Sequence, residues 1–442
     1  MPNPALLCLS RPVHSLLALA VLAPLGAASP GPAPAQDQAP PVAKDRKALV
    51  EALLAVEPYR KETRAELDAL LAPYASAPAP TGSKRKKVLK DVAKLWSKGA
   101  ELPTKGGEHW YFEEGKRGRF FVSGRTKKPK GLFIGLHGGG VGSADASGSY
   151  GAYQSAASSR GWVALFPQAL EATERGWTDS GTEEWIMRLI DEARRTYDVP
   201  PDRVYIGGHS MGGYGSWVLG AHHADLFAAA VPSAGAPTPI LERGTNRIID
   251  MQEGVIPSLR NLPMCVFQST DDPRVGPGPN QYANVLVEKA KEKYGGYDDF
   301  TYWEVADRGH GYPKGGTDAL LERIESFERE PHPDRVVWQP VLDWRTGFYW
   351  LDWPEPEMNA IVDARLDRGA NRIDVVVEGD AKGLAVLVGP EVCDMERELV
   401  VTLGGEEVFR GIPPTSWTTL VRTALANDPG RLYEGRIELA PR

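Results

Sequence analysis

One serine of the chain stands in a setting that could make its hydroxyl a nucleophile. Ser210 is the central residue of the pentapeptide GHSMG (208–212), which has the form G-x-S-x-G. The apolar, strand-like run 203–207 precedes it, and a helical stretch follows. In such a strand-to-helix turn the serine is held in a strained backbone conformation, and flanking glycines avoid a collision of Cβ atoms with neighbouring backbone. This placement favours a nucleophile over the alternative, a purely structural glycine turn.

A serine hydroxyl is a weak nucleophile until a base takes its proton, and the chain offers a histidine for this step. Where a G-x-S-x-G turn carries the serine, the acid and the base follow it in the order Ser, Asp/Glu, His. Only His310 and His332 lie late enough, and His332 is flanked by prolines in a linker that would hold an imidazole poorly. His310 follows the strand-like run 300–305 and is therefore the predicted general base. His209 precedes the serine, but a residue at that position is expected to point away from the reacting side.

The acid of the site has two candidates after another strand-like run. Asp271 and Asp272 both follow the run 264–269. Either carboxylate could hold the imidazole in the correct tautomer and stabilise the imidazolium that forms during the reaction. The residues themselves leave this choice open.

Two backbone amides are candidates for an oxyanion hole. The amide of Met211 would lie at a helix N-terminus, where it can stabilise a developing negative charge. The loop GLHGGGVG continues from the run 131–136, and its glycines would let the backbone approach a substrate oxygen, with Gly139 as the first choice and Gly138 as the second. The alternative, a phosphate-binding loop, lacks both G-K-[ST] and G-x-G-x-x-G.

Aromatic side chains in or near the same segments are candidates for substrate binding. Trp177 and Tyr312 could contact an aromatic acyl group or a sugar, as could Trp185, with packing in the core or at the rim as the alternative. No long lid is predicted between the strands, and 246–260 is the best candidate for a small cap. An open site of this kind would admit polymeric or bulky esters.

All of these residues belong to a region in which apolar runs alternate with helical stretches. The runs predicted as buried strands are 131–136, 162–166, 203–207, 227–235, 264–269 and 300–305, and the predicted helices are 146–160, 183–197, 211–222, 280–293 and 317–327. Such alternation predicts an α/β fold with a mostly parallel sheet covered by helices on both faces. Sheets of this kind place their sites outside the carboxyl ends of the strands, where the candidate residues lie.

The rest of the chain divides into three further parts. Residues 1–35 contain an arginine, an apolar run and small residues, the pattern of a signal peptide cleaved after Ala35, which predicts a secreted or periplasmic protein. An uncleaved membrane anchor is the alternative. Residues 36–104 are predicted as a proline-rich linker with helices, 105–330 as the catalytic domain, and 335–442 as a small antiparallel, β-sandwich-like domain.

The composition argues against several other classes of protein. The net charge is −7, so charge gives no case for nucleic-acid binding. No group of cysteines and histidines has zinc-binding spacing, and neither a metal nor a cofactor is predicted. Cys265 and Cys393 lie far apart in apolar surroundings and are predicted to be buried free thiols.

These motifs together resemble the α/β-hydrolase superfamily. LHGGG, GHSMGG, STDDPRV and DRGHGY occur in the expected order over 105–327. The stretch 197–217 is similar to secreted esterases related to polyhydroxybutyrate depolymerases and feruloyl or acetylxylan esterases, and to prolyl-oligopeptidase-type hydrolase domains. In that family the acid is the second aspartate of a TDDP-type turn, which implies Asp272 and leaves Asp271 as a turn residue. The chain departs from the family at 268–269, where Gln-Ser replaces a frequent His-Gly.

The resemblance implies a secreted serine hydrolase that acts on carboxylic esters, including polymeric esters and esters linked to plant polysaccharide. A serine peptidase of the prolyl-oligopeptidase type is the alternative, although only about a hundred residues precede the hydrolase region, too few for the propeller of those enzymes. A second alternative is a non-catalytic secreted protein whose C-terminal β domain binds polysaccharide or a partner. The ordered set of serine, aspartate and histidine favours the hydrolase.

Overall fold

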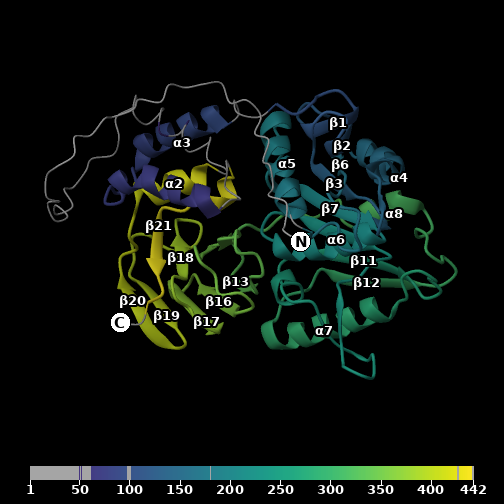
Figure 1. The fold of residues 1–442 in the computed structure, drawn as a ribbon. Helices are drawn as coiled ribbons and strands as arrows, with labels where there is room; N and C mark the ends of the chain where they lie inside the picture. Colours follow the sequence, from purple (N-terminus) through teal and green to yellow (C-terminus); the bar gives the residue numbers. More distant parts are fainter. Residues whose placement is uncertain are drawn as a thin grey trace, which may run out of the picture.

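The computed structural model describes Leu49, Glu51 and residues 61–96, 101–179, 181–425 and 428–440. The predicted signal peptide and the proline-rich linker lie outside these residues. Figure 1 shows an α/β region beside a β-rich C-terminal region, with two N-terminal helices packed over the latter. Among the described residues, no helix is both long and apolar enough to cross a bilayer.

An eight-stranded sheet forms the centre of the α/β region, in the order β1-β2-β6-β3-β7-β8-β11-β12 (Figure 1). Its strands are β1 (Gly107–Glu113), β2 (Arg117–Gly124), β3 (Leu132–Leu136), β6 (Val163–Pro167), β7 (Val204–His209), β8 (Ala229–Ser233), β11 (Met264–Ser269) and β12 (Phe300–Val305). β1 and β2 form an antiparallel hairpin, β2 pairs antiparallel with β6, and the other neighbours are parallel. This mostly parallel sheet confirms the predicted α/β-hydrolase fold.

Helices cover both faces of the sheet, as predicted. They are α4 (Ala146–Ser159), α5 (Thr182–Tyr197), α6 (Met211–His222), α7 (Gly278–Tyr294) and α8 (Gly316–Glu322). Tyr153 of α4 and Leu320 of α8 belong to the core around Phe133. Trp217 of α6 belongs to the core around Ile134, together with residues of α5 and α7. Since Phe133 and Ile134 are successive residues of β3, these two cores lie on opposite faces of the sheet.

The C-terminal region forms two further sheets, with the orders β13-β16-β17-β19-β20 and β14-β15-β18-β21. Their strands are β13 (Arg335–Trp338), β14 (Gly347–Phe348), β15 (Leu351–Asp352), β16 (Ile361–Asp367), β17 (Arg372–Glu378), β18 (Ala385–Val388), β19 (Leu399–Leu403), β20 (Glu406–Gly411) and β21 (Gly435–Glu438). β17 and β19 pair in parallel, so the prediction of a purely antiparallel sandwich is wrong at this pair. The hydrophobic core of this region continues into that of the α/β region, because Val362 and Val386 share one cluster with Trp217.

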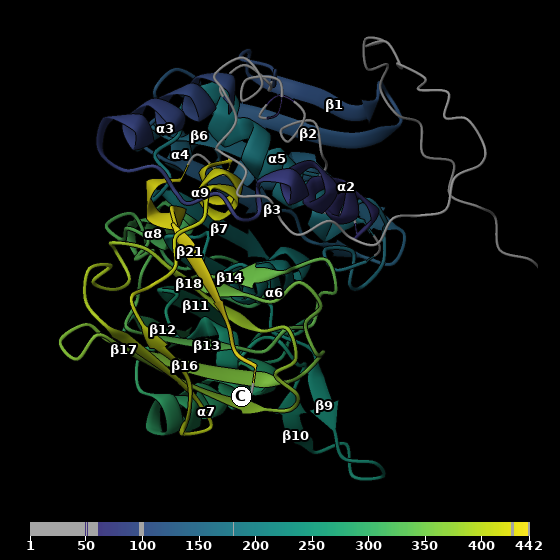
Figure 2. The same ribbon diagram turned by 90° about the vertical axis from the view of Figure 1, so that its left-hand side faces the viewer.

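The N-terminal helices pack on the C-terminal region, a contact that the sequence does not predict (Figures 1 and 2). α2 (Lys61–Leu71), the short helix η1 (Ala72–Tyr74) and α3 (Gly82–Trp96) lie within residues 36–104, where the sequence predicts helices. Val88 of α3 shares a core with Trp417 of α9 (Trp417–Ala424), and the Trp417 amide donates to the Ala77 carbonyl at 2.8 Å. Arg85 donates to the Glu434 carboxylate at 2.5 Å. These contacts join the two ends of the described chain.

Two buried aspartates join the α/β region to the C-terminal region. Asp225, just after α6, accepts from Arg345 and Arg431. Asp428 accepts two hydrogen bonds from Arg329, at 2.8 and 2.7 Å. Each aspartate has only 1% of its surface exposed, and leaving a buried charge unpaired typically costs about 3–5 kcal/mol. The pairs therefore hold the C-terminal region in place against the end of α6.

Candidate active site

Ser210 occupies a sharp turn between β7 and α6. Its φ is 62° and its ψ −121°, a strained conformation for a residue with a Cβ atom. A Cβ at Gly208 would lie 2.6 Å from the Leu136 carbonyl oxygen, and one at Gly212 would lie 2.2 Å from the same atom. Neither position can hold a side chain, so the structure agrees with the interpretation of the flanking glycines.

The acid and base candidates meet beyond the ends of β11 and β12. Nδ1 of His310 lies 2.8 Å from Oδ2 of Asp272, and the Asp272 side chain has no exposed surface. Oδ1 of Asp272 accepts from the amides of Arg274 and Val275, at 2.8 and 2.9 Å. Burial acts to raise the pKa of Asp272, but the amide of Val275 and the ring of His310 outweigh it and hold this pKa below its usual value. An ionised Asp272 accepts a hydrogen bond from the Nδ1–H group of His310, which leaves Nε2 as the basic nitrogen.

Asp271 has a different position from its neighbour. Its carboxylate accepts from the Ser269 hydroxyl at 2.5 Å and from the Gly309 amide at 3.1 Å. It therefore ties the end of β11 to the loop that carries His310, without contacting the imidazole. This geometry agrees with the turn role expected for Asp271.

His209 does not point away from the other site residues, and that expectation is wrong. The centre of its ring lies 4.7 Å from the ring of His310 and 4.6 Å from that of Tyr312. Its Nε2 is buried without a hydrogen-bond partner. Burial, and then the neighbouring His310, lower the pKa of His209 to about 4. The residue therefore packs as a neutral ring against the predicted base, directly before Ser210 in the chain.

The glycine loop after β3 lies against the serine. A Cβ at Gly138 would lie 3.3 Å from the Ser210 Cβ and 3.9 Å from its Oγ. Gly139 belongs to the short strand β4 (Gly139–Gly140), which pairs with β5 (Ser143–Ala144). Its φ is 156°, and a Cβ there would lie 2.2 Å from the Ser143 carbonyl oxygen and 3.5 Å from Cε of Met211. The loop and the first residue of α6 thus converge next to the Ser210 side chain.

His137 supports this loop and was not identified from the sequence. Its Nε2 accepts from the Ala169 amide at 3.0 Å, so the ring proton is on Nδ1, which donates to the Gly138 carbonyl at 2.7 Å. Burial lowers the pKa of His137 to about 4, which keeps the ring neutral. The Gly138–Gly139 peptide is thereby fixed in orientation. The only signal in the sequence is the position of this histidine directly before the three glycines.

Of the aromatic residues predicted to contact a substrate, the two tryptophans are buried and the tyrosine is partly exposed. Trp177 has no exposed surface and Trp185 has 1%, so the prediction that they contact a substrate is wrong for this structure. The Trp177 ring packs 4.7 Å from that of His137 and its Nε1 donates to the His137 carbonyl at 3.3 Å, which makes it a second support of the loop. Tyr312 is half-buried over His209 and stays a candidate.

The segment predicted as a cap begins earlier than expected. β9 (Pro239–Leu241) and β10 (Ile248–Met251) form an antiparallel hairpin, followed by the short helix η2 (Pro257–Leu259). The predicted range 246–260 contains β10 and η2 but omits β9. The hairpin follows β8 and projects from the body of the protein (Figure 2), and its strand β10 contacts α7 through Tyr282.

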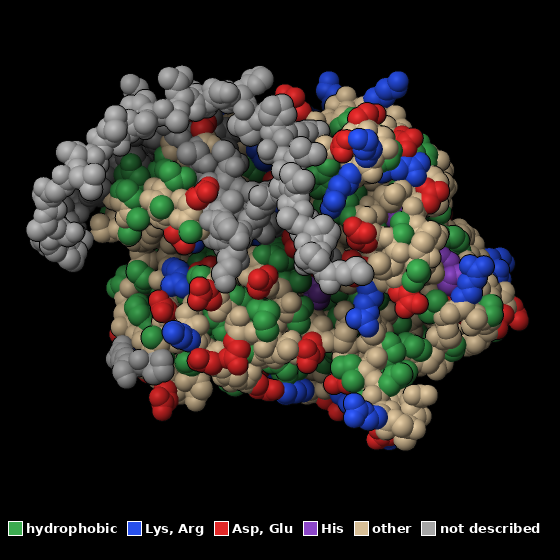
Figure 3. Space-filling model, viewed as in Figure 1, with side chains coloured by type: hydrophobic (Ala, Val, Ile, Leu, Met, Phe, Trp, Pro, Cys, Tyr) green, Lys and Arg blue, Asp and Glu red, His purple; other side chains and the backbone are tan. Residues whose placement is uncertain are grey.

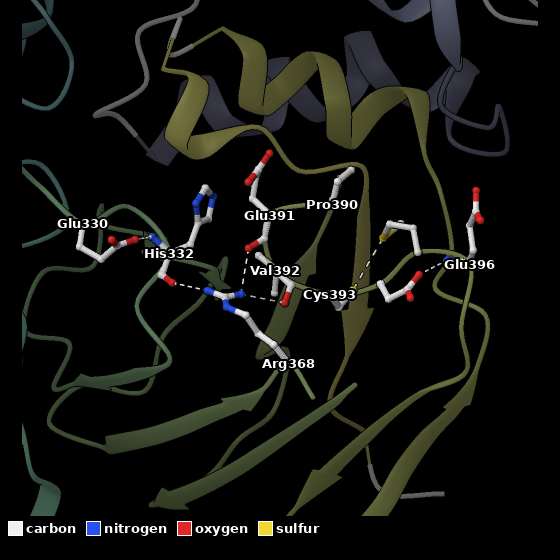
Figure 4. A pocket seen from close by; sticks show the side chains of 10 residues that line it. Glu330, His332, Arg368, Pro390, Glu391, Val392, Cys393 and Glu396 are labelled. Atoms are coloured by element: carbon white, nitrogen blue, oxygen red, sulfur yellow. Dashed lines mark hydrogen bonds between the residues drawn. The ribbon is translucent and has the colours of Figure 1, made fainter. Parts of the chain in front are cut away.

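His332, the alternative base, lies at a different place. It lines a cavity of about 760 Å³ together with Glu330, Arg368 and residues 390–396 of the C-terminal region (Figure 4). Its backbone amide donates to Glu330 at 2.9 Å, and its carbonyl accepts from Arg368 at 2.6 Å. The structure therefore brings His310, and not His332, to Asp272.

Comparisons with known proteins agree with the resemblance seen in the sequence. No family model matches the chain. Two curated relatives are a bifunctional acetylxylan esterase/xylanase of Neocallimastix patriciarum, 28% identical over 26% of this chain, and a poly(3-hydroxyalkanoate) depolymerase of Paucimonas lemoignei, 33% identical over 16%. The matches span only 20% and 17% of those relatives. The recognition of an α/β-hydrolase similar to such esterases is confirmed.

Solved structures with a similar fold include further esterases. A thermostable esterase is 22% identical, over 51% of this chain and 63% of its own, with a TM-score of 0.38. A ferulic acid esterase of Anaeromyces mucronatus is 17% identical, over 52% of this chain and 92% of its own, with a TM-score of 0.35. About half of the present chain thus lies outside each of these alignments.

Proposed function

We propose that the protein is a secreted serine hydrolase of carboxylic esters. Ser210 is the nucleophile, His310 the general base and Asp272 the residue that orients it. The amides of Met211 and Gly139 hold the oxyanion, with Gly138 completing the loop. The main support for this proposal is the hydrogen bond of 2.8 Å between His310 and Asp272. The strained turn that holds Ser210 at a φ of 62° supports it as well.

The proposed reaction proceeds through an acyl-enzyme. Oγ of Ser210 attacks the ester carbonyl while Nε2 of His310 takes its proton, and the carbonyl oxygen becomes an oxyanion at the two amides. The C–O bond to the alcohol breaks, and His310 returns the proton to the leaving oxygen. A water molecule, activated by the same histidine, then attacks the acyl-enzyme and releases the acid. None of these steps uses a cofactor.

Secretion and a polymeric substrate are parts of the same proposal. The order of an arginine, an apolar run and small residues before Ala35 supports export. The names of the two curated relatives, an acetylxylan esterase/xylanase and a poly(3-hydroxyalkanoate) depolymerase, support a substrate class of polymeric esters.

The class of reaction can be tested with an active-site probe and a substrate panel. A fluorophosphonate probe should attach to Ser210, as read by peptide mass analysis, and should leave Ser216, in the following helix α6, unlabelled. The protein should hydrolyse p-nitrophenyl acetate and butyrate, and acetyl-sugar or hydroxyalkanoate esters, faster than aminoacyl p-nitroanilides. Faster cleavage of the anilides would identify a peptidase instead. A protein that neither reacts with the probe nor cleaves any ester would be a binding protein.

Replacing Asp272 by asparagine should lower kcat by about 10⁴-fold, since the wrong imidazole tautomer would then face Ser210. The matched control is Asp271→Asn, which changes the adjacent carboxylate and leaves the imidazole contact intact. We expect that control to stay within about tenfold of the wild type, since it loses only hydrogen bonds within the turn. Initial rates with p-nitrophenyl acetate measure both variants. If Asp271→Asn is the more damaging change, the assignment of the acid is wrong.

A further inference from the structure

Exposed apolar side chains concentrate at the β9–β10 hairpin and the facing side of α7. Among the described residues, nine large hydrophobic side chains are exposed, and four of them lie here. Ile240 and Leu241 of β9 are 39% and 48% exposed, Ile249 of β10 is 43% exposed, and Val285 of α7 is 46% exposed. In Figure 3, hydrophobic side chains interrupt the charged surface at the lower right, where the hairpin lies.

These side chains border a groove. Between β10 and α7 lies a cavity of about 680 Å³, with Ile248 and Ile249 on one wall and Tyr282 and Val285 on the other. The Tyr282 hydroxyl donates to the Ile249 carbonyl at 2.7 Å and so ties the two walls together. The hairpin register shifts between Ile248 and Asp250, so Ile249 is the extra residue of a β-bulge. A bulge changes the direction in which nearby side chains point.

Two charged residues at the hairpin tip, Arg247 and Glu242, are paired with each other. Arg247, at the end of the groove, donates to Glu242 at 3.1 Å, and the Thr245 hydroxyl donates to the same carboxylate at 2.6 Å. The walls of the groove therefore offer mainly aliphatic and aromatic surface to a ligand. Burial of a methylene group on such a surface improves binding about fourfold.

The two elements that form the groove, the hairpin and α7, both start near the nucleophile turn. The hairpin leaves the carboxyl end of β8 through Gly235, where a Cβ would lie 2.2 Å from the Ser210 carbonyl oxygen. Its base is closed by the Gln252 amide, which donates to the Thr238 carbonyl at 2.8 Å. The first turn of α7 is joined to the same place, because Asn280 donates to the Gly235 carbonyl at 3.2 Å. Both walls thus begin next to the nucleophile turn.

We propose that the groove between β10 and α7 is a subsite that binds an aliphatic chain of the ester substrate. The proposal rests on the proposed function of Ser210. An ester held at Ser210 extends in two directions, through its acyl chain and through its alcohol. The groove binds whichever of these carries the aliphatic chain, and the hairpin is then the element that sets preference for chain length.

The test compares chain-length profiles of variants in the groove. Ile249→Ser and Val285→Ser are measured on p-nitrophenyl esters with acyl chains of two, six and ten carbons, and on acetate esters of ethanol, hexanol and decanol. All substrates stay below their micelle-forming concentrations. Val376→Ser and Ile412→Ser are matched controls in the C-terminal region, because Val376, in β17, is 51% exposed and Ile412, directly after β20, is 61% exposed.

Circular dichroism should show that all four variants are folded, and the two controls should match the wild type in kcat/KM on every ester. In the two groove variants, kcat/KM for the ten-carbon substrates should fall tenfold or more in one series, and that series identifies the acyl or the alcohol side. Groove variants whose profiles superimpose on the wild type in both series would overturn the subsite while leaving the esterase proposal intact. A wild type that cleaves no ester would overturn both.

Discussion

Replacing Ser210 by alanine should lower kcat for p-nitrophenyl acetate by about 10⁶-fold, the loss typical of a missing serine nucleophile in a triad. The physical reason is that no other group can form the acyl-enzyme, so only the oxyanion amides and substrate binding would remain. Alanine carries a Cβ like serine, so the strained backbone at this position is equally costly before and after the change. The variant should therefore fold, with a melting temperature close to that of the wild type.

Ser216→Ala is a suitable control for this experiment. Ser216 lies in α6, the helix that follows Ser210. It is fully buried, and its hydroxyl donates to the Gly212 carbonyl at 2.7 Å. Its loss removes a hydroxyl near the turn at a cost of about 1 kcal/mol of stability but no reacting group, so activity should stay within about tenfold. Residual activity of Ser210→Ala close to the wild type, in a preparation free of other esterases, would refute the nucleophile assignment.

His310→Ala should reduce kcat by a similar factor, about 10⁶-fold, because the serine hydroxyl then has no base. The informative comparison is His209→Ala, since the two rings lie only 4.7 Å apart. His209 has no hydrogen-bond partner at Nε2, and burial keeps it neutral. Its removal should loosen the packing under His310 and cost no more than about 10²-fold.

The measurement for this pair is the steady-state rate with p-nitrophenyl acetate across a range of pH, alongside circular dichroism to check folding. His209→Phe keeps a ring against His310 and Tyr312, so it should recover activity that His209→Ala loses. If His209→Ala and His310→Ala are equally inactive while both remain folded, the assignment of the base to His310 alone is wrong.

The fold of the catalytic region was predictable because its signals are local. Each buried strand is a short apolar run, and these runs alternate with helical stretches, so element type and order follow from neighbouring residues. The turn at Ser210 is local in the same way, because the need for glycine at 208 and 212 arises from backbone within the turn and in β3. These features depend little on distant parts of the chain.

Other features depend on contacts between distant segments, and sequence reasoning missed or misjudged them. The sequence does not reveal that Trp177 is buried and supports the glycine loop, because this role depends on its contact with His137, forty residues earlier. The parallel pairing of β17 with β19 depends on which strands become neighbours in the sheet. The docking of α3 on α9 brings together Val88 and Trp417, which are more than three hundred positions apart.

The amino-acid sequence by itself determined the α/β-hydrolase fold and the chain order of a serine, an aspartate and a histidine, since both are written in local patterns. The residue types alone do not show whether Asp271 or Asp272 is the acid, because adjacent side chains in a turn point in different directions. Only the tertiary structure decided that Asp272 faces His310, at 2.8 Å, while Asp271 holds the neighbouring loop. The tertiary structure also places His209 beside the base and forms an apolar groove between β10 and α7, because both arise where segments far apart in the chain meet.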